Sequence, residues 1–203
     1  QQVRNGFFPR NRWTDLTNSA ARFSEAPLYI VDTPGLSVLT VRSISRQLAA
    51  DLRRKGKSLG MVIIDYLQLM RGSSARSENR QQEVSDISRG LKFLARDLSV
   101  PVVALSQLSR RTEEKGRADA RPQLSDLRES GAIEQDADLV AFIYREAYYL
   151  ETKEPPMDDP LEFQKWKEKM DRVHGLADVL VEKHRHGPTA KVTLRFEKQF
   201  TRF

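Results

Sequence analysis

The sequence contains no cysteine, and this absence limits both its chemistry and the ways in which it can be stabilised. None of its 203 residues can form a disulfide, bind a metal as a thiolate or act as a thiol nucleophile. The three histidines lie close together towards one end of the chain, which does not favour a histidine metal site. A sequence without cysteine is compatible with the reducing cytoplasm.

Long apolar runs are also absent. No stretch approaches the roughly 18 residues that a membrane-spanning helix requires, and the first residues lack the pattern of a signal peptide. We therefore expect a soluble, cytoplasmic protein without a membrane partner. Of the 203 residues, 39% are hydrophobic, so the chain fits one ordinary domain with a core of its own.

A phosphate-binding loop of the form Gly-x-x-x-x-Gly-Lys-Ser/Thr is missing as well. The triplet Gly56-Lys57-Ser58 imitates the end of this motif, but Asp51 occupies the position of its first glycine. The triplet also follows a predicted helix, residues 38–55, and precedes a strand, whereas a phosphate loop joins a strand to a helix in that order. We therefore expect an ordinary helix-ending loop here.

Positive charge is in excess. The 34 Lys and Arg residues outnumber the 28 Asp and Glu residues, which gives a net charge of +6 and a pI of about 9.6. Such a balance favours a polyanionic partner, and nucleic acid above all. The alternative is that these side chains cover ordinary solvated helices.

The sequence is organised around an apolar run, residues 61–70, that contains one carboxylate, Asp65. Its β-branched residues predict a buried parallel strand. A strand covered on both faces can carry a charge only at its tip, because an unpaired charge deeper inside would be strongly destabilising. In phosphate-handling α/β proteins, a strand-end Asp holds the water shell of Mg²⁺ beside the nucleotide phosphates. The simpler alternative is a strand that ends at a turn.

A second buried strand is predicted at residues 100–107, and it ends in Gln107. Apolar residues at helical spacing between residues 84 and 98 predict a helix that connects the two strands. Strand, helix and strand in this order place Asp65 and Gln107 at the same edge of a parallel sheet. A Gln there can both donate to and accept from a phosphate oxygen or an attacking water. A Gln at the end of a strand is otherwise commonplace.

Two basic loops adjoin these strands. Arg76 and Arg80 lie in the polar segment 71–82, and five Lys and Arg residues lie in the long loop 108–125. Loops of this kind at the tips of parallel strands bind ligands, or else they are solvated linkers. The polar block 125–138 follows, and its arginine and its glycine-containing turn can bind a nucleic-acid backbone.

The remaining segments predict strands, a helix and a hairpin. Residues 28–32 read as a short strand closed by a Pro-Gly turn, and residues 139–144 read as a third buried strand. The charged stretch 146–172 reads as a surface insertion with one helix, docked by Phe163 and Trp166. The chain ends as a β-hairpin, with strands at residues 177–182 and 190–196.

Four motifs follow one another in a fixed order: Asp65-Tyr66-Leu67-Gln68-Leu69-Met70, Val103-Ala104-Leu105-Ser106-Gln107-Leu108, the block 125–138, and Lys183-x-Arg185-x-Gly187-Pro188. Together they closely resemble the C-terminal motor domain of the bacterial replicative DNA helicases, the DnaB family, over residues 27–203. The resemblance implies an α/β fold: a RecA-like, mostly parallel sheet flanked by helices, with a C-terminal β-hairpin. Residues 1–203 would form the C-terminal portion of a single ATPase domain.

The resemblance also implies cofactors, partners and roles for particular residues. Family members assemble as rings of six, bind ATP and Mg²⁺ between neighbouring subunits, and move single-stranded DNA through the central channel. Primase and a helicase loader are their expected partners. By matching position, Asp65 would hold Mg²⁺ through water, Gln107 would sense the γ-phosphate, and Lys183 and Arg185 would reach the nucleotide of the adjacent subunit. Contacts to DNA would come from Arg76, Arg80, Arg128, Glu129 and Gly131.

Two departures from the family pattern qualify this expectation. His184 and His186 flank Arg185, where the family more often has Gln and Asn, and the insertion at 146–172 looks long. The phosphate loop and the catalytic Glu of the family should precede residue 1. We therefore expect an incomplete core and a chain that is inactive by itself. The alternative function is a non-catalytic module with a RecA-like core that binds nucleic acid or supports assembly. A recombinase with the same core fits the block 125–138 and the hairpin less well.

Overall fold

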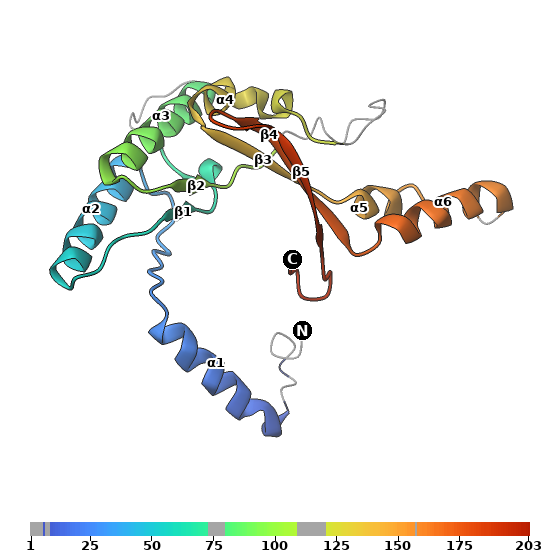
Figure 1. Cartoon of the computed structure of the whole chain (residues 1–203), viewed down its shortest axis with the longest axis horizontal. Coiled ribbons are helices and arrows are strands. Elements are labelled where there is room, and N and C mark those ends of the chain that lie inside the picture. Colours follow the sequence, from blue (N-terminus) through green and yellow to red (C-terminus); the bar gives the residue numbers. More distant parts are fainter. Residues whose placement is uncertain (1–5, 7–8, 73–79, 109–120, 157) are drawn as a thin grey trace. The chain divides into compact units, whose positions relative to one another are not determined.

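The computed structural model describes residues 6, 9–72, 80–108, 121–156 and 158–203. The chain divides into two compact units, residues 1–34 and 35–203. The first unit contains a short 3₁₀ turn, η1 (Arg10–Arg12), and one helix, α1 (Trp13–Glu25), none of whose residues is buried. The elements of the second unit are labelled in Figure 1 and are taken in turn below.

The strand predicted at residues 28–32 is wrong. These residues are extended but form no strand, and Leu28, Tyr29 and Ile30 are exposed. A β-strand needs a neighbour to satisfy its backbone N–H and C=O groups, and the described residues offer none here. The turn that follows is present, with Gly35 in the left-handed region at φ +68°.

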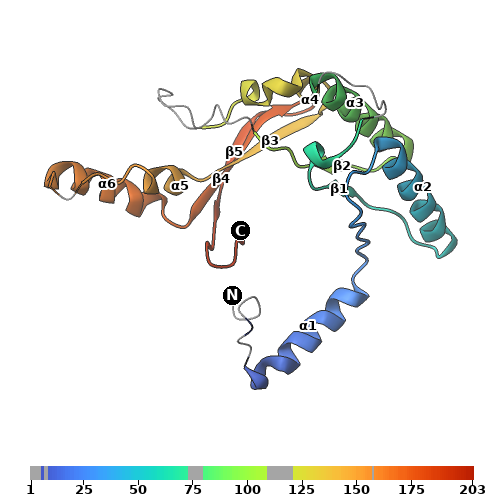
Figure 2. The same ribbon diagram turned by 180° about the vertical axis from the view of Figure 1, so that it is seen from behind.

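Helices α2 (Val38–Arg54) and α3 (Arg80–Leu98) lie side by side and form one layer of the second unit (Figures 1 and 2). The side chain of Ser37 caps α2 by accepting from Thr40 N at 3.1 Å. At the other end of α2, Gly56 adopts φ +68°, so the triplet Gly56-Lys57-Ser58 lies in a helix-ending loop as predicted. Two ion pairs join the helices, from Arg42 and Arg46 of α2 to Asp97 of α3.

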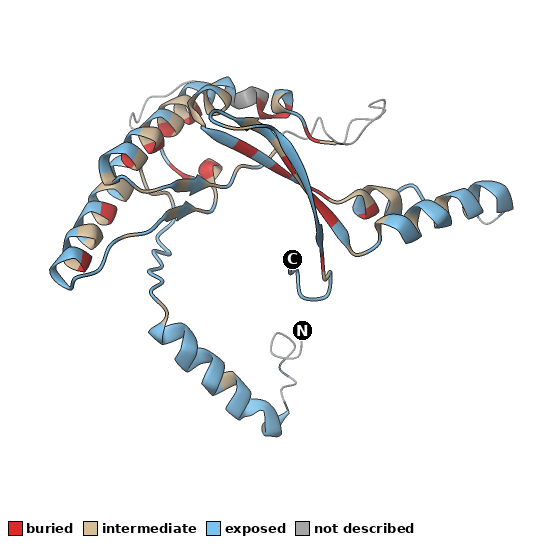
Figure 3. Ribbon diagram, viewed as in Figure 1, coloured by how far each residue is buried: buried red, intermediate tan, exposed pale blue. Residues whose placement is uncertain are grey.

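Strands β1 (Val62–Ile64) and β2 (Val102–Ala104) pair in parallel, with Ile64 opposite Ala104. Their inner face meets a core that includes the turn η2 (Leu67–Leu69) and helix α3, in which Ile87 and Leu94 are almost completely buried (Figure 3). The expectation of strands buried on both faces is wrong, since Ile63 is 63% exposed. Parallel strands are buried when elements cover both faces, and the described residues cover only one.

The second sheet is antiparallel, in the order β3–β4–β5, formed by β3 (Leu139–Tyr144), β4 (Leu176–His184) and β5 (Ala190–Arg195). The C-terminal hairpin is thus confirmed. Alternate residues of β3 are buried, against the 3₁₀ segment η4 (Leu124–Ser130) and β4, so β3 is half-buried, not buried throughout. Helix α4 (Gly131–Asp136) links η4 to β3 and packs against α3.

The charged stretch contains two helices, α5 (Glu146–Glu151) and α6 (Pro160–Val173), where one was predicted. Trp166 Nε1 donates to Leu150 O at 2.9 Å, and the ring of Phe163 lies against that of Trp166, so these two residues dock α6 as expected. Asp159 caps α6 and Pro160 occupies its first position, which explains why the second helix starts there. Within the described ranges, no helix has the length and apolar character that crossing a membrane would require.

Candidate functional site

Asp65 and Gln107 lie at the same edge of the β1–β2 sheet, because the strands that carry them run in parallel and in register. Both residues are exposed, and the peptide bond between Asp65 and Tyr66 is cis. A hollow of about 300 Å³ is lined by Tyr66, Leu105, Ser106 and Gln107. The Asp65 carboxylate forms no hydrogen bond or ion pair with the described residues, so its oxygens are available to a ligand.

Gln68 connects the two strand ends, and sequence reasoning missed it. Its side-chain amide donates to Gln107 O at 3.1 Å and accepts from Gln107 N at 3.3 Å. The same nitrogen also reaches Ser106 Oγ at 3.1 Å. A single amide thus reproduces the pairing of a neighbouring strand and fixes the backbone of Gln107. The alternating polarity of residues 65–70 was the only signal, and it does not reveal a contact 39 residues away.

Arg80 was predicted to bind DNA, and the structure places it beside the same edge. It donates to Gln68 O at 2.8 Å and forms an ion pair with Glu83. Glu83 in turn accepts from Gly72 N at 2.7 Å, and this bond, with the charge of Arg80, holds the pKa of Glu83 below its ordinary value. Arg80 therefore supports the loop after β1. Arg76 lies outside the described residues.

The other residues predicted to bind DNA lie where η4 meets α4. Arg128 and Glu129 belong to η4. The structure describes their backbone but not their side chains. Gly131 begins α4 and is exposed, with open space where a side chain would project. Upstream, Asp126 is buried and accepts from Gln123 N at 2.7 Å, which caps the start of η4. The start of this segment is thus anchored by a buried carboxylate.

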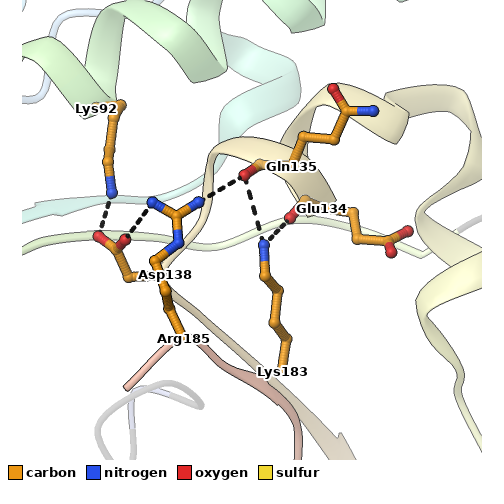
Figure 4. A network of polar contacts seen from close by, with 6 residues as sticks. All are labelled: Lys92, Glu134, Gln135, Asp138, Lys183 and Arg185. Atoms are coloured by element: carbon orange, nitrogen blue, oxygen red, sulfur yellow. Dashed lines mark hydrogen bonds and ion pairs between the residues drawn. The ribbon is translucent and has the colours of Figure 1, made fainter.

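Lys183 and Arg185 lie together at the end of β4, as the motif predicts, and both contact residues of their own chain (Figure 4). Lys183 donates to Glu134 O, and Arg185 donates to Gln135 O at 3.1 Å. The side chain of Arg185 is 40% exposed. In the turn that follows, the ring of His184 packs so closely over Gly187 that a Cβ at this position would collide with it. The action of the pair on a neighbouring subunit stays a prediction.

A basic hollow of about 620 Å³ opens at the other end of the antiparallel sheet, where sequence reasoning placed no site. Its lining includes His174, Arg195 and Lys198, and the guanidinium of Arg145 lies 4.2 Å from the centre of the Phe196 ring. A guanidinium over an aromatic ring makes a cation–π contact, which fixes where its positive charge lies. The basic and aromatic residues that end β3 and β5 were the available signal.

Neither edge forms a metal site made of protein alone. Groups of three or more His, Asp or Glu side chains that could share an ion do not occur among the described residues. Mg²⁺ in phosphate-handling sites usually keeps several waters and is held by one or two carboxylates together with the phosphates. A single exposed carboxylate at a strand end, such as Asp65, fits that mode of binding.

An α/β core that presents a carboxylate and an amide at adjacent ends of parallel strands places them where α/β proteins bind their ligands. Comparison with known families shows which family this is. The chain belongs to the DnaB-like helicase C-terminal domains, whose family model matches residues 1–203. The resemblance read from the four motifs is confirmed.

Known relatives and solved structures agree with this assignment. The replicative DNA helicase DnaB of Rickettsia prowazekii (strain Madrid E) is 46% identical over 201 residues, covering 99% of this chain and 40% of that protein. A solved ATPase domain superposes with a TM-score of 0.78 at 39% identity, over 98% of this chain and 61% of that one. A DnaB-like replicative helicase, solved in a study of its interactions with primase, gives a TM-score of 0.75 at 40% identity over 94% of this chain and 41% of its own. The RecA-like α/β fold is thereby confirmed. The chain spans about 40% of the length of the curated relative.

Proposed function

We propose that this chain is part of the motor of a replicative DNA helicase, which couples ATP hydrolysis at subunit interfaces to movement along single-stranded DNA and to duplex unwinding. Membership of the DnaB-like family over residues 1–203 is the observation that carries the proposal. The exposed Asp65 at the edge of a parallel sheet supports it, because such a group is otherwise left without a partner among the described residues.

In this proposal ATP and Mg²⁺ are the cofactors. Asp65 would hold Mg²⁺ through water, and the bound ion would neutralise charge on the phosphates. Gln107, fixed by Gln68, would contact the γ-phosphate or orient the attacking water. Lys183 and Arg185 would supply positive charge to the nucleotide of the neighbouring subunit, and the planar fork of Arg185 suits a phosphoryl group.

Single-stranded DNA would be bound through its phosphates by Arg76, Arg80, Arg128, Glu129 and Gly131, with the acidic Glu129 placed there by family position alone. Phosphate contacts depend little on base sequence and weaken steeply with salt. A homo-hexameric ring in the cytoplasm is the assembly that this function needs. Primase is the expected partner, since one structural relative was solved in a study of its interactions with primase. A helicase loader is expected from the family resemblance alone.

The 203-residue chain by itself should be inactive. It contains no phosphate loop, and positioning of the phosphates supplies most of the catalysis in phosphoryl transfer. The second candidate function, a module that binds nucleic acid or supports assembly without hydrolysis, is favoured by the basic net charge of +6.

Hydrolysis and strand separation by the full-length protein decide between these functions. In the wild-type protein we expect ATP hydrolysis that single-stranded DNA stimulates. Asp65→Asn should abolish hydrolysis, and Arg128→Ala should remove its stimulation by DNA. Arg172→Ala, an exposed arginine on α6, is the matched control and should behave as wild type. DNA binding without hydrolysis in the wild-type protein would instead establish the non-catalytic module.

A further inference from the structure

Helix α4 ends against the two cations at the end of β4. The last carbonyl groups of a helix have no partner within it and attract positive charge. Here Lys183 Nζ donates to Glu134 O and lies 3.4 Å from Gln135 O, while Arg185 Nη2 donates to Gln135 O at 3.1 Å (Figure 4). Both cations therefore end on the backbone of α4, which fixes where they lie relative to that helix.

Asp138 holds Arg185 a second time. The backbone N–H of Arg185 donates to Asp138 O at 2.8 Å, and its Nη1 lies 3.2 Å from Asp138 Oδ1. One residue thus fixes both the main chain and the guanidinium of Arg185. A long, flexible side chain held at both ends loses most of its alternative conformations in advance.

The carboxylate of Asp138 is itself fixed. Its other oxygen accepts from Lys92 of α3, whose side chain is only 18% exposed. This hydrogen bond, and the charges of Lys92, Arg185 and His186, hold the pKa of Asp138 below its ordinary value, so the group is ionised at neutral pH. The anion that faces Arg185 is therefore present whether or not a nucleotide is bound.

Some of the donors of Arg185 stay available. Its Nε–H has no hydrogen-bond partner among the described residues, and the side chain is 40% exposed. A guanidinium has five N–H donors in one plane. Held along one side by Asp138 and Gln135, it can still present donors to an anion from another molecule.

We propose that Asp138 is the positioning residue of Arg185: with the carboxyl end of α4 it forms a cradle that presents the guanidinium to the neighbouring nucleotide. The proposal rests on the proposed function, in which Arg185 acts on that nucleotide. Asp138 touches neither nucleotide nor DNA in this account and acts only through Arg185. A misplaced catalytic group can lower a rate by about one to two orders of magnitude.

Two measurements on the full-length ring test this role. In the first, Asp138→Asn should lower kcat about tenfold while the KM for ATP stays within about twofold, because the group acts in the transition state. In the second, made without nucleotide, phenylglyoxal should label Arg185 several-fold faster in Asp138→Asn than in wild type, as followed by mass spectrometry. Asp97→Asn is the matched control, since Asp97 also binds two cations from another element, and it should change neither reading.

Further variants separate the possible outcomes. In an Arg185→Ala background, Asp138→Asn should have no further effect on kcat, because both changes remove the same action. Lys92→Met keeps the contact between Asp138 and Arg185, so it should lower kcat much less than Asp138→Asn does. An equal loss in Lys92→Met and Asp138→Asn would overturn the proposal, because Asp138 would then act by joining α3 to β3.

The failure of this proposal can be told apart from the failure of the proposed function. If Arg185→Ala hydrolyses ATP normally, the trans-acting role of Arg185 is wrong. If Arg185→Ala is inactive while Asp138→Asn shows wild-type kcat and labelling, only the positioning role is wrong. Should Asp138→Asn assemble poorly, Asp138→Glu moves the carboxylate by one methylene and tests the same contact. Faster labelling together with a lower kcat would support the proposal, and unchanged labelling with a lower kcat would contradict it.

Discussion

Two carboxylates, Asp65 and Asp138, lie next to strands of the two sheets, and their surroundings differ. Asp65 is exposed at the end of β1 and has no partner among the described residues. Asp138 is also exposed, yet it binds Lys92 and Arg185 and has a lowered pKa. The first edge offers a carboxylate to a ligand, whereas the second uses its carboxylate to hold another side chain. The comparison thus separates a carboxylate that is available to a ligand from one that positions another side chain.

Both sheets, by contrast, are covered by the described residues on one face only. Outward-facing Ile63 and Val103 of the parallel sheet are exposed, as is Ile143 of β3, while the inner faces pack against α3 and η4 respectively. Stability in the parallel region therefore depends on its single covered face, and in particular on α3.

The largest effect should come from truncating that covered face. Leu94 of α3 is completely buried, so Leu94→Ala should lower the free energy of unfolding by about 2–5 kcal/mol. The neighbouring Phe93 is 54% exposed, and Phe93→Ala should change it by only about 0.5 kcal/mol. Urea denaturation of the 203-residue chain measures both. Equal losses in the two variants would mean that α3 does not pack on the sheet as described.

An intermediate effect should come from loosening the open edge. Gln68→Leu removes three hydrogen bonds to Ser106 and Gln107, so in the full-length protein kcat should fall about tenfold. Gln164→Leu removes a glutamine from the exposed face of α6 and should leave kcat unchanged. A Gln68→Leu enzyme as fast as wild type would show that Gln107 needs no support from this amide.

The smallest effect should appear as a dependence of stability on acid pH. The hydrogen bond from Arg46, with that from Arg42 and the charges of both, holds the pKa of Asp97 below its ordinary value of 3.8. A carboxyl with a lowered pKa in the folded state stabilises the fold above its ordinary pKa, and this contribution is lost as the pH falls through the lowered value.

Thermal unfolding of the 203-residue chain at a series of pH values tests this dependence. We expect Asp97→Asn to flatten the loss of stability below pH 3.8, because asparagine cannot take up the proton. Asp158→Asn, at an exposed carboxylate before α6, serves as control and should keep the wild-type slope. Parallel curves for Asp97→Asn and wild type would indicate that the ion pairs between α2 and α3 do not contribute to stability.

Sequence reasoning succeeded where a local pattern decides the structure. Apolar residues at helical spacing placed α2 and α3, and alternation placed β4 and β5. The strand at residues 139–144 was found with its bounds unchanged, although its partner and its half-burial were not foreseen. Residues 28–32 have the composition of a strand, but strand formation depends on a neighbour that composition does not provide.

The polar contacts of the candidate site were beyond prediction for a related reason. Gln68 reaches Gln107 across 39 residues, and Lys92 reaches Asp138 across 46, so no local spacing reveals either pair. Asp65, Gln107, Lys183 and Arg185 could be named from the sequence because their motifs are contiguous. The residues that hold Gln107 and Arg185 in place emerged only once the strands and α4 were seen together.

The central claim, that one subunit supplies Arg185 to a site that another subunit builds around Asp65, has a direct test. Full-length Asp65→Asn and Arg185→Ala should each be nearly inactive, since a trans-acting arginine contributes about 10³ or more to the rate. Mixed in equal amounts under conditions in which rings demonstrably exchange subunits, they should regain ATP hydrolysis, because random mixing makes roughly one interface in four competent. The absence of any recovered hydrolysis in such mixed rings would contradict the account.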